Sequence, residues 1–176
     1  MGPSGAGKDT LLSYARARLT GAPVLFAHRY ITRAPSGDEN FVSLDPREFA
    51  ARLDAGLFAY HWEANGHRYG IGIEVERWRT DGRAVVVSGS RAHFAASLAE
   101  RDDVTPVLVT APPEILAARL AGRGREDEAA IAARLRRAAM DEIRHPRLLR
   151  VENAGTPAEA GDRLAALIRA CAMEFV

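Results

Sequence analysis

The first ten residues carry the spacing of a phosphate-binding loop. Gly2 and Gly7 are separated by four residues, and Lys8 follows directly. Because glycine has no side chain, consecutive backbone N–H groups can surround a phosphate, and the lysine adds a positive charge. Lys8 is the single lysine among the 24 basic residues, so arginine serves everywhere else. A glycine-rich turn before a helix is the alternative interpretation.

We therefore expect this opening loop to bind the phosphates of a nucleotide. The residues in question are Gly2, Pro3, Ser4, Gly5, Ala6, Gly7, Lys8, Asp9 and Thr10.

Asp9 occupies the place where such a loop normally carries Ser or Thr to hold a magnesium ion. A carboxylate oxygen is a natural ligand for Mg²⁺, so Asp9 is the candidate metal ligand, directly or through water. Thr10 is the second candidate. Alternatively, Asp9 is a favourable charge at a helix N-terminus that braces the loop.

Composition favours one domain spanning residues 1–176, because 47% hydrophobic residues supply enough material for one core. The net charge of +1 gives no basic field for nucleic acid. Cys171 is the single cysteine, and no apolar run approaches the roughly 20 residues that span a bilayer. We expect a cytoplasmic protein that binds neither nucleic acid nor membrane, and the composition is compatible with a homodimer.

Strand-like and helix-like segments alternate along the chain. Apolar, β-rich runs predict strands within 23–33, 83–90, 104–113 and 148–153. Helical spacing predicts helices at 8–19, 46–55, 73–80, 91–101, 113–120, 127–143 and 157–171. This alternation predicts an α/β fold, a three-layer sandwich with a parallel sheet between helices.

A phosphate loop is the turn between a buried strand and a helix, yet the sequence starts at the loop itself. We expect about five to eight mostly apolar residues to be encoded upstream and to form the first strand. The alternative is a sheet that folds with a gap.

Several motifs resemble those of guanylate kinases. They are the loop GPSGAGK, the run at 41–72 with Phe-Val-Ser and Asn-Gly-x-x-Tyr-Gly, the segment RLAGRGRED at 119–127 followed by Arg134-Leu135, and Val-Glu-Asn at 151–153. The resemblance covers nearly the whole chain. It implies a P-loop kinase with an acceptor-binding segment at about 33–72 and a lid at about 120–136.

The same resemblance implies roles for individual side chains. Arg119, Arg123 and Arg134 would contact the transferred phosphates, and Arg33 and Tyr69 would bind the acceptor phosphate. Arg91, after the strand that ends Gly-Ser, would reach the acceptor. Arg125 is left open between a phosphate ligand and a surface charge. Five further arginines are expected to be solvated surface charges: Arg136, Arg137, Arg144, Arg147 and Arg150.

Two departures from guanylate kinases bear on the substrate. The segment after Thr32 is shorter and has only Arg33, where that family has two arginines. The family's guanine-reading glutamate falls at Tyr60, which offers no carboxylate to a base. A purine bound there would leave buried N–H groups unpaired, so we expect guanine to be rejected.

The chain resembles ribose 1,5-bisphosphate phosphokinases, whose loop ends Gly-Lys-Asp. The loop GPSGAGKD, the short Thr-Arg segment, the stretch at 61–71 and Gly89-Ser90-Arg91 carry this resemblance. It implies ATP- and Mg²⁺-dependent phosphorylation of ribose 1,5-bisphosphate to 5-phosphoribosyl 1-diphosphate, in phosphonate catabolism. Guanylate kinases carry an acidic residue after their third strand. The matching segment 85–91 has none, which suggests that Asp9 takes over the role of that acid.

Three alternatives remain from the sequence. They are a guanylate kinase that converts GMP to GDP, a kinase for another small phosphorylated or free sugar, and an inactive guanylate-kinase-like interaction module. Modules of the last kind generally lose the phosphate loop, which this chain keeps.

Overall fold

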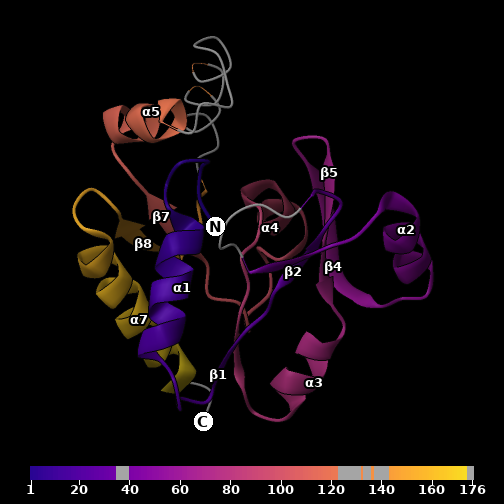
Figure 1. Cartoon of the computed structure of the whole chain (residues 1–176). Helices are drawn as coiled ribbons and strands as arrows, with labels where there is room; N and C mark the ends of the chain where they lie inside the picture. Colours follow the sequence, from indigo (N-terminus) through magenta and orange to yellow (C-terminus); the bar gives the residue numbers. More distant parts are fainter. Residues whose placement is uncertain (35–39, 123–131, 133–135, 137–142, 174–176) are drawn as a thin grey trace. The chain divides into compact units, whose positions relative to one another are not determined.

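The computed structural model describes residues 1–34, 40–122, 132, 136 and 143–173. The chain forms two compact units (Figure 1). The first comprises Met1–Tyr14 and Gly89–Leu164, and the second comprises Ala15–Ser88 and Ala165–Val176. Helices α1 (Lys8–Arg18) and α7 (Pro157–Met173) each contribute residues to both units. The single domain expected from composition stays a prediction.

The first unit is built on a parallel strand pair. β7 (Val107–Thr110) pairs with β8 (Leu149–Glu152) in a register that sets Val109 opposite Val151. Met1 lies against β7: its amino group donates to the Val107 carbonyl at 2.9 Å, and its own carbonyl accepts from the Val109 N–H at 2.8 Å. These two bonds follow the pattern of a parallel ladder. A strand upstream of Met1 stays a prediction.

The helices of this unit have identifiable start signals. α5 (Pro113–Ala121) has proline at its first position, where the missing N–H is not needed. α4 (Arg91–Ser97) is capped by Ser90, whose Oγ accepts from the His93 N–H. α7 starts with a capping box, in which Thr156 and Glu159 each accept from the other's N–H. The hydrogen bonds from Thr156 lower the pKa of the Glu159 carboxyl.

Helices α1 and α7 lie side by side in the first unit (Figure 1). The Tyr14 ring packs on Gly161, where a Cβ would collide with it, and the Tyr14 hydroxyl donates to Asp162 Oδ1 at 3.1 Å. Glycine is therefore required for this close helix contact.

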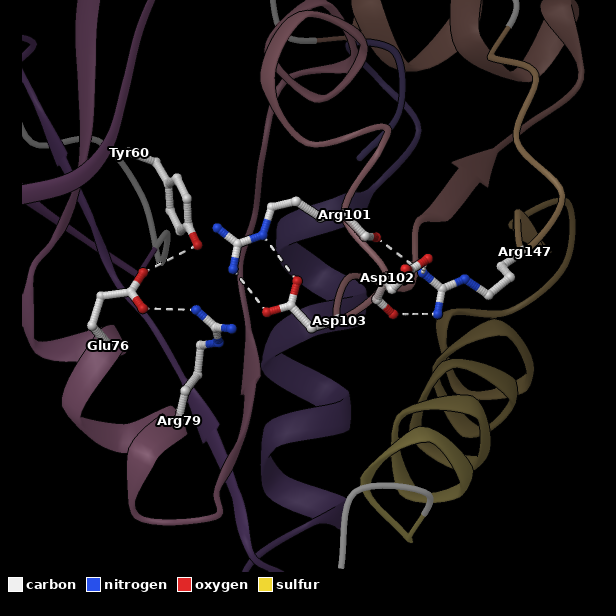
Figure 2. A network of polar contacts seen from close by, with 7 residues as sticks. All are labelled: Tyr60, Glu76, Arg79, Arg101, Asp102, Asp103 and Arg147. Atoms are coloured by element: carbon white, nitrogen blue, oxygen red, sulfur yellow. Dashed lines mark hydrogen bonds and ion pairs between the residues drawn. The ribbon is translucent and has the colours of Figure 1, made fainter.

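Arg147 joins two loops of the first unit (Figure 2). Its guanidinium donates to the carbonyls of Asp102 and Arg101, and Arg101 in turn pairs with Asp103 at 2.7 Å. His145 Nε2 hydrogen-bonds with the Ala99 carbonyl at 3.0 Å. Arg147 is exposed, as predicted, but it also fixes the chain that leads into β8.

The second unit holds a parallel pair and a mixed four-stranded sheet. β1 (Val24–Phe26) pairs with β6 (Ala84–Val86). The sheet has the order β3-β2-β5-β4 and consists of β2 (Arg29–Ile31), β3 (Phe41–Ser43), β4 (Phe58–Ala64) and β5 (His67–Gly72). Helices α2 (Pro46–Asp54) and α3 (Glu74–Thr80) complete it.

A β-bulge in β4 directs its aromatic side chains to opposite faces of the sheet. Phe58 pairs with Gly72 and Tyr60 with Ile71, so Ala59 is the extra residue. Without it, side chains two apart on the strand would share a face. Because of it, Phe58 stacks on Phe49 of α2 at 4.6 Å, whereas Tyr60 packs with Ile71 in the cluster on the opposite face.

We call the face that carries Tyr60, Trp62, Tyr69 and Ile71 the α2-distal face, because α2 covers the other one. Trp62 lies opposite Tyr69 in the register, and the two rings stack at 5.4 Å. Toward one end, this face is packed by Ala27 and Val75.

Most predicted elements are confirmed, with three differences. The predicted strand at 23–33 is two strands, because the chain leaves β1 after Phe26 and joins another sheet at Arg29. The predicted helix at 91–101 ends at Ser97. Strands β3, β4 and β5 were missed, and the predicted helix at 127–143 lies almost wholly outside the described residues. Within the described ranges, no helix has both the length and the apolar character needed to cross a bilayer.

Replacing Gly70 with alanine tests the packing that orients the sheet. A Cβ there would lie 2.6 Å from two Phe58 ring carbons, and the buried ring cannot swing away from Phe49. We expect Gly70→Ala to lower stability by about 1–3 kcal/mol, which is a fall in Tm of roughly 3–10 °C. Gly89→Ala is the control, since nothing lies within 4 Å of its Cβ. Equal Tm values for the two variants would contradict this packing.

Candidate active site

The opening loop lies in the first unit and contacts three different elements through its glycines. A Cβ on Gly2 would collide with the Val109 carbonyl of β7. A Cβ on Gly5 would lie 3.4 Å from Leu116 and Leu120 of α5, and one on Gly7 would lie 2.5 Å from Asn153 Nδ2. The loop is therefore packed closely against its neighbours, and a Cβ would not fit at Gly2 or at Gly7.

Gly7 leads directly into helix α1 and has a φ of +82°. Other residues rarely adopt this value, so the turn into the helix requires glycine. The first N–H groups of a helix have no carbonyl within it to donate to, and its N-terminus carries a partial positive charge. The start of α1 thus offers the donors and the charge that a phosphate needs.

Lys8 is folded back onto the loop. Its Nζ donates to the Pro3 carbonyl at 3.0 Å. The charges of Lys8, Asp9 and Arg91 all shift the pKa of the Met1 amino group. The pKa of that group is lowered to about 5, mainly by burial and then by Lys8 and Arg91, while Asp9 acts in the opposite direction. The structure therefore places these three predicted residues near one another, around the start of the loop.

Asn153, the residue after β8, supports the loop from behind. It is 3% exposed, and its Nδ2 donates to the Ala6 carbonyl at 2.9 Å. Arg119 of α5 approaches the same point, since its Nη1 would lie 3.8 Å from a Cβ on Gly7. Arg119 was predicted as a site residue from the sequence, whereas Asn153 was noted only as part of the Val-Glu-Asn motif and was given no role.

The described residues contain no magnesium site made by side chains alone. Asp9 is half-buried in the first turn of α1, and Thr10 is exposed. Among the described residues, no group of three or more His, Cys, Asp or Glu side chains could hold a metal ion. Any Mg²⁺ here would have to take most of its oxygen ligands from phosphates and water, with one carboxylate from the protein, which is a usual arrangement for this ion.

The acceptor candidates Arg33 and Tyr69 lie in the second unit on the α2-distal face. Tyr69 is 8% exposed and pairs with Ile31 of β2. The Arg33 guanidinium lies 4.9 Å from the centre of the Phe41 ring, and Phe41 pairs with Arg29 on the same face as Ile31. Thr32, which precedes Arg33, is tied to β5. Its N–H donates to the Arg68 carbonyl, and its hydroxyl accepts from the Arg68 N–H.

Tyr60 belongs to a network of polar side chains in the second unit (Figure 2). Its hydroxyl donates to Glu76 Oε1 at 3.3 Å, and Arg79 pairs with Glu76 Oε2 at 2.7 Å. Each oxygen of this carboxylate already accepts from a side chain of the protein. The rejection of guanine stays a prediction.

The remaining candidates of the predicted lid, Arg123 and Arg134, lie outside the described residues. Their roles stay predictions, as does the lid itself.

Comparison with known proteins places the chain in a family. A family model described as "AAA domain" matches residues 1–138. A protein of Desulfomicrobium baculatum named "Ribose 1,5-bisphosphate phosphokinase PhnN" is 52% identical over 170 residues, which cover 96% of this chain and 91% of that protein. A protein of the same name from Burkholderia mallei is 48% identical over 176 residues, covering 98% and 94%. The chain belongs to the ribose 1,5-bisphosphate phosphokinase family.

The fold agrees with that family assignment. The crystal structure of guanylate kinase from Anaplasma phagocytophilum matches with a TM-score of 0.65 at 20% identity, covering 90% of this chain and 80% of that one. At this identity the match establishes the fold alone, an α/β guanylate-kinase-like P-loop fold as predicted.

Gly7→Ala tests whether the loop of this family member needs the close approach of Asn153. We expect ATP affinity to fall at least about tenfold, because the new Cβ must displace the loop or break the Asn153 bond to Ala6. Gly21→Ala is the matched control: Gly21 has a similar φ of +85° but nothing within 4 Å of its Cβ. It should lose stability but keep ATP affinity, measured by calorimetry. An equal loss of affinity in both variants would contradict this account of the loop.

Proposed function

We propose that this protein is a ribose 1,5-bisphosphate phosphokinase that transfers the γ-phosphoryl group of ATP to the 1-phosphate of ribose 1,5-bisphosphate. The observation that carries the proposal is identity of about half the residues over nearly the whole chain to proteins of that name. The fully kept phosphate loop supports it, because an interaction module has no use for Lys8 or for glycines at Gly2 and Gly7.

The transfer needs little covalent chemistry from the protein. An oxygen of the 1-phosphate forms a bond to the γ-phosphorus, the bond from that phosphorus to the bridging oxygen of ADP breaks, and ADP leaves with the electron pair. Catalysis consists mainly of positioning and of neutralising charge. The product on the sugar is 5-phosphoribosyl 1-diphosphate.

In this proposal the loop and Lys8 bind the β- and γ-phosphates. Lys8 would exchange its bond to Pro3 for phosphate oxygens, which are stronger acceptors because they are charged. Arg119 has a buried Nη1 without a hydrogen-bond partner, close to Gly7, so a phosphate oxygen would satisfy it. Arg123 and Arg134 would add two further guanidinium groups during transfer.

Arg33, Tyr69 and Arg91 would serve the acceptor. A guanidinium grips phosphate oxygens through two parallel N–H bonds and keeps its charge at all relevant pH values. Stacking on Phe41 and Trp62 holds Arg33 and Tyr69 in defined orientations on the α2-distal face. The proposed acceptor has no nucleobase. This is consistent with a tyrosine at position 60, whose hydroxyl is bonded to Glu76 and which offers no carboxylate to a base.

Asp9 would be the protein's own ligand to Mg²⁺. When bound, the ion neutralises phosphate charge and orients the β- and γ-phosphates. Asp9 suits this role because it lies in the first turn of α1, next to Lys8, where the phosphates are expected. The pathway would be phosphonate catabolism, with the protein in the cytoplasm.

The assignment is tested by comparing two acceptors. The protein with ATP and Mg²⁺ should form 5-phosphoribosyl 1-diphosphate from ribose 1,5-bisphosphate and leave GMP essentially unchanged, as followed by ³¹P NMR. Lys8→Ala should lower the rate at least about a hundredfold, whereas Arg163→Ala on the exposed side of α7 should not. Turnover of GMP at a similar rate would favour a guanylate kinase, and absence of ATP binding would favour an interaction module.

The metal role of Asp9 is tested by Asp9→Ser. We expect the Mg²⁺ concentration for half-maximal rate to rise about tenfold and kcat to fall, because one charged oxygen ligand is lost. Glu114→Gln is the control, since it removes an exposed acid from the first turn of α5. If Asp9→Ser lowers Tm but leaves the Mg²⁺ dependence unchanged, Asp9 is a helix-terminal charge and not a ligand.

A further inference from the structure

Two complementary polar atoms without partners belong to side chains that both approach Gly7 of the phosphate loop. Asn153 Oδ1 is an acceptor and Arg119 Nη1 is a donor, and both are buried without a hydrogen-bond partner. They come from elements far apart in the sequence, the end of β8 and the last turn of α5. Both side chains contact the space that a Cβ of Gly7 would fill.

Buried polar atoms without partners are rare, because each costs about 1–3 kcal/mol of desolvation. The Asn153 amide group is anchored on one side, since its Nδ2 donates to the Ala6 carbonyl and its backbone N–H donates to the Thr110 carbonyl at 2.8 Å. Its orientation is therefore set by the loop and by β7. The Oδ1 atom is left facing away from Ala6, as the only remaining hydrogen-bonding atom of the side chain.

We propose that Asn153 is a positioning residue that couples the phosphate loop to Arg119. Its Nδ2 holds the Ala6 carbonyl turned toward β8, which keeps this negative dipole out of the phosphate cradle. Its Oδ1 accepts one N–H of Arg119 when the guanidinium engages a nucleotide phosphate, so that the remaining N–H groups are directed at the phosphate. The second step rests on the nucleotide-binding role proposed for Arg119.

The contacts of Arg119 support this coupling. Leu116 and Leu120, which precede and follow it on α5, pack against Gly5 of the loop. The helix thereby contacts the loop on both sides of Arg119, which places the base of this long side chain beside the loop. A fixed acceptor at its base reduces the conformations that the long side chain must give up when it binds phosphate.

The proposal is tested by Asn153→Asp, which keeps the shape and the Oδ1 acceptor but replaces the donor to Ala6 with a second acceptor. We expect the Kd for ATP, measured by calorimetry, to rise at least about tenfold, because two oxygens then face each other. The KM for ribose 1,5-bisphosphate should change less than about twofold. Glu152→Gln, at the exposed neighbouring position, is the control and should leave both values unchanged.

A role in folding alone would lower Tm without separating these two constants. If Asn153→Asp does not fold, Asn153→Ser replaces it, because serine is smaller and neutral. An ATP Kd within about twofold of the parent in a folded variant would overturn the proposal.

The link to Arg119 is tested by a double-mutant cycle with Arg119→Ala and Asn153→Ser, read out as kcat/KM for ATP. If the side chains act together, the double variant should be less impaired than the product of the single effects by at least about threefold. Multiplicative effects would overturn the coupling. Failure of the parent to bind ATP would instead overturn the proposed function, so the two failures are distinguishable.

Discussion

The phosphate loop depends on close contact between backbones and on the buried amide of Asn153. Three glycines of the loop each approach a different element: β7, α5 and the residue after β8. At Gly2 and Gly7 these contacts leave no room for a Cβ. The loop is therefore held in place by its neighbours, which orients its N–H groups before any nucleotide arrives. Such preorganisation is what electrostatic stabilisation of a phosphoryl group requires.

The acceptor candidates depend on a different constraint, the separation of the two faces of a small sheet. One face is packed by α2 through Phe49 and Phe58, and the opposite face carries Tyr69 and Arg33. The aromatic side chains there have a double use. They bury apolar area, and they hold a hydroxyl and a guanidinium in fixed places. Because a ribose phosphate offers little apolar surface, recognition must come from charge and hydrogen bonds, which need such fixed partners.

Local patterns in the sequence predicted the loop, most of the helices and the parallel strands, because each depends on neighbouring residues. Lys8 and Asp9 follow from the spacing of glycines, and α2 follows from helical periodicity. The hairpin of β4 and β5 was missed, although Asn65-Gly66 with φ values of 50° and 74° is a strong turn signal. Its strands were read only as a family motif.

The role of Asn153 could not be found from local patterns, although the residue ends the Val-Glu-Asn motif. Its function depends on Ala6, 147 positions earlier, and on Arg119 of another helix. Contacts between residues so far apart in the sequence are set by the packing of β8 beside β7, and they produce no periodic pattern in the sequence. The break at Ala27 and His28 was missed for a similar reason. The β-rich segment 23–33 looks like one strand, but its two halves belong to different sheets.

The extra residue Ala59 gives β4 an unusual sensitivity to length. Losing that single position would rotate the start of the strand by half a turn, so that Phe58 would leave α2 and enter the side occupied by Tyr60. Point substitutions in this strand change one contact each, whereas a one-codon deletion would exchange two packing environments at once. Evolutionary change here is thus expected to proceed by replacement of side chains, with the number of residues between Leu57 and Tyr60 held constant.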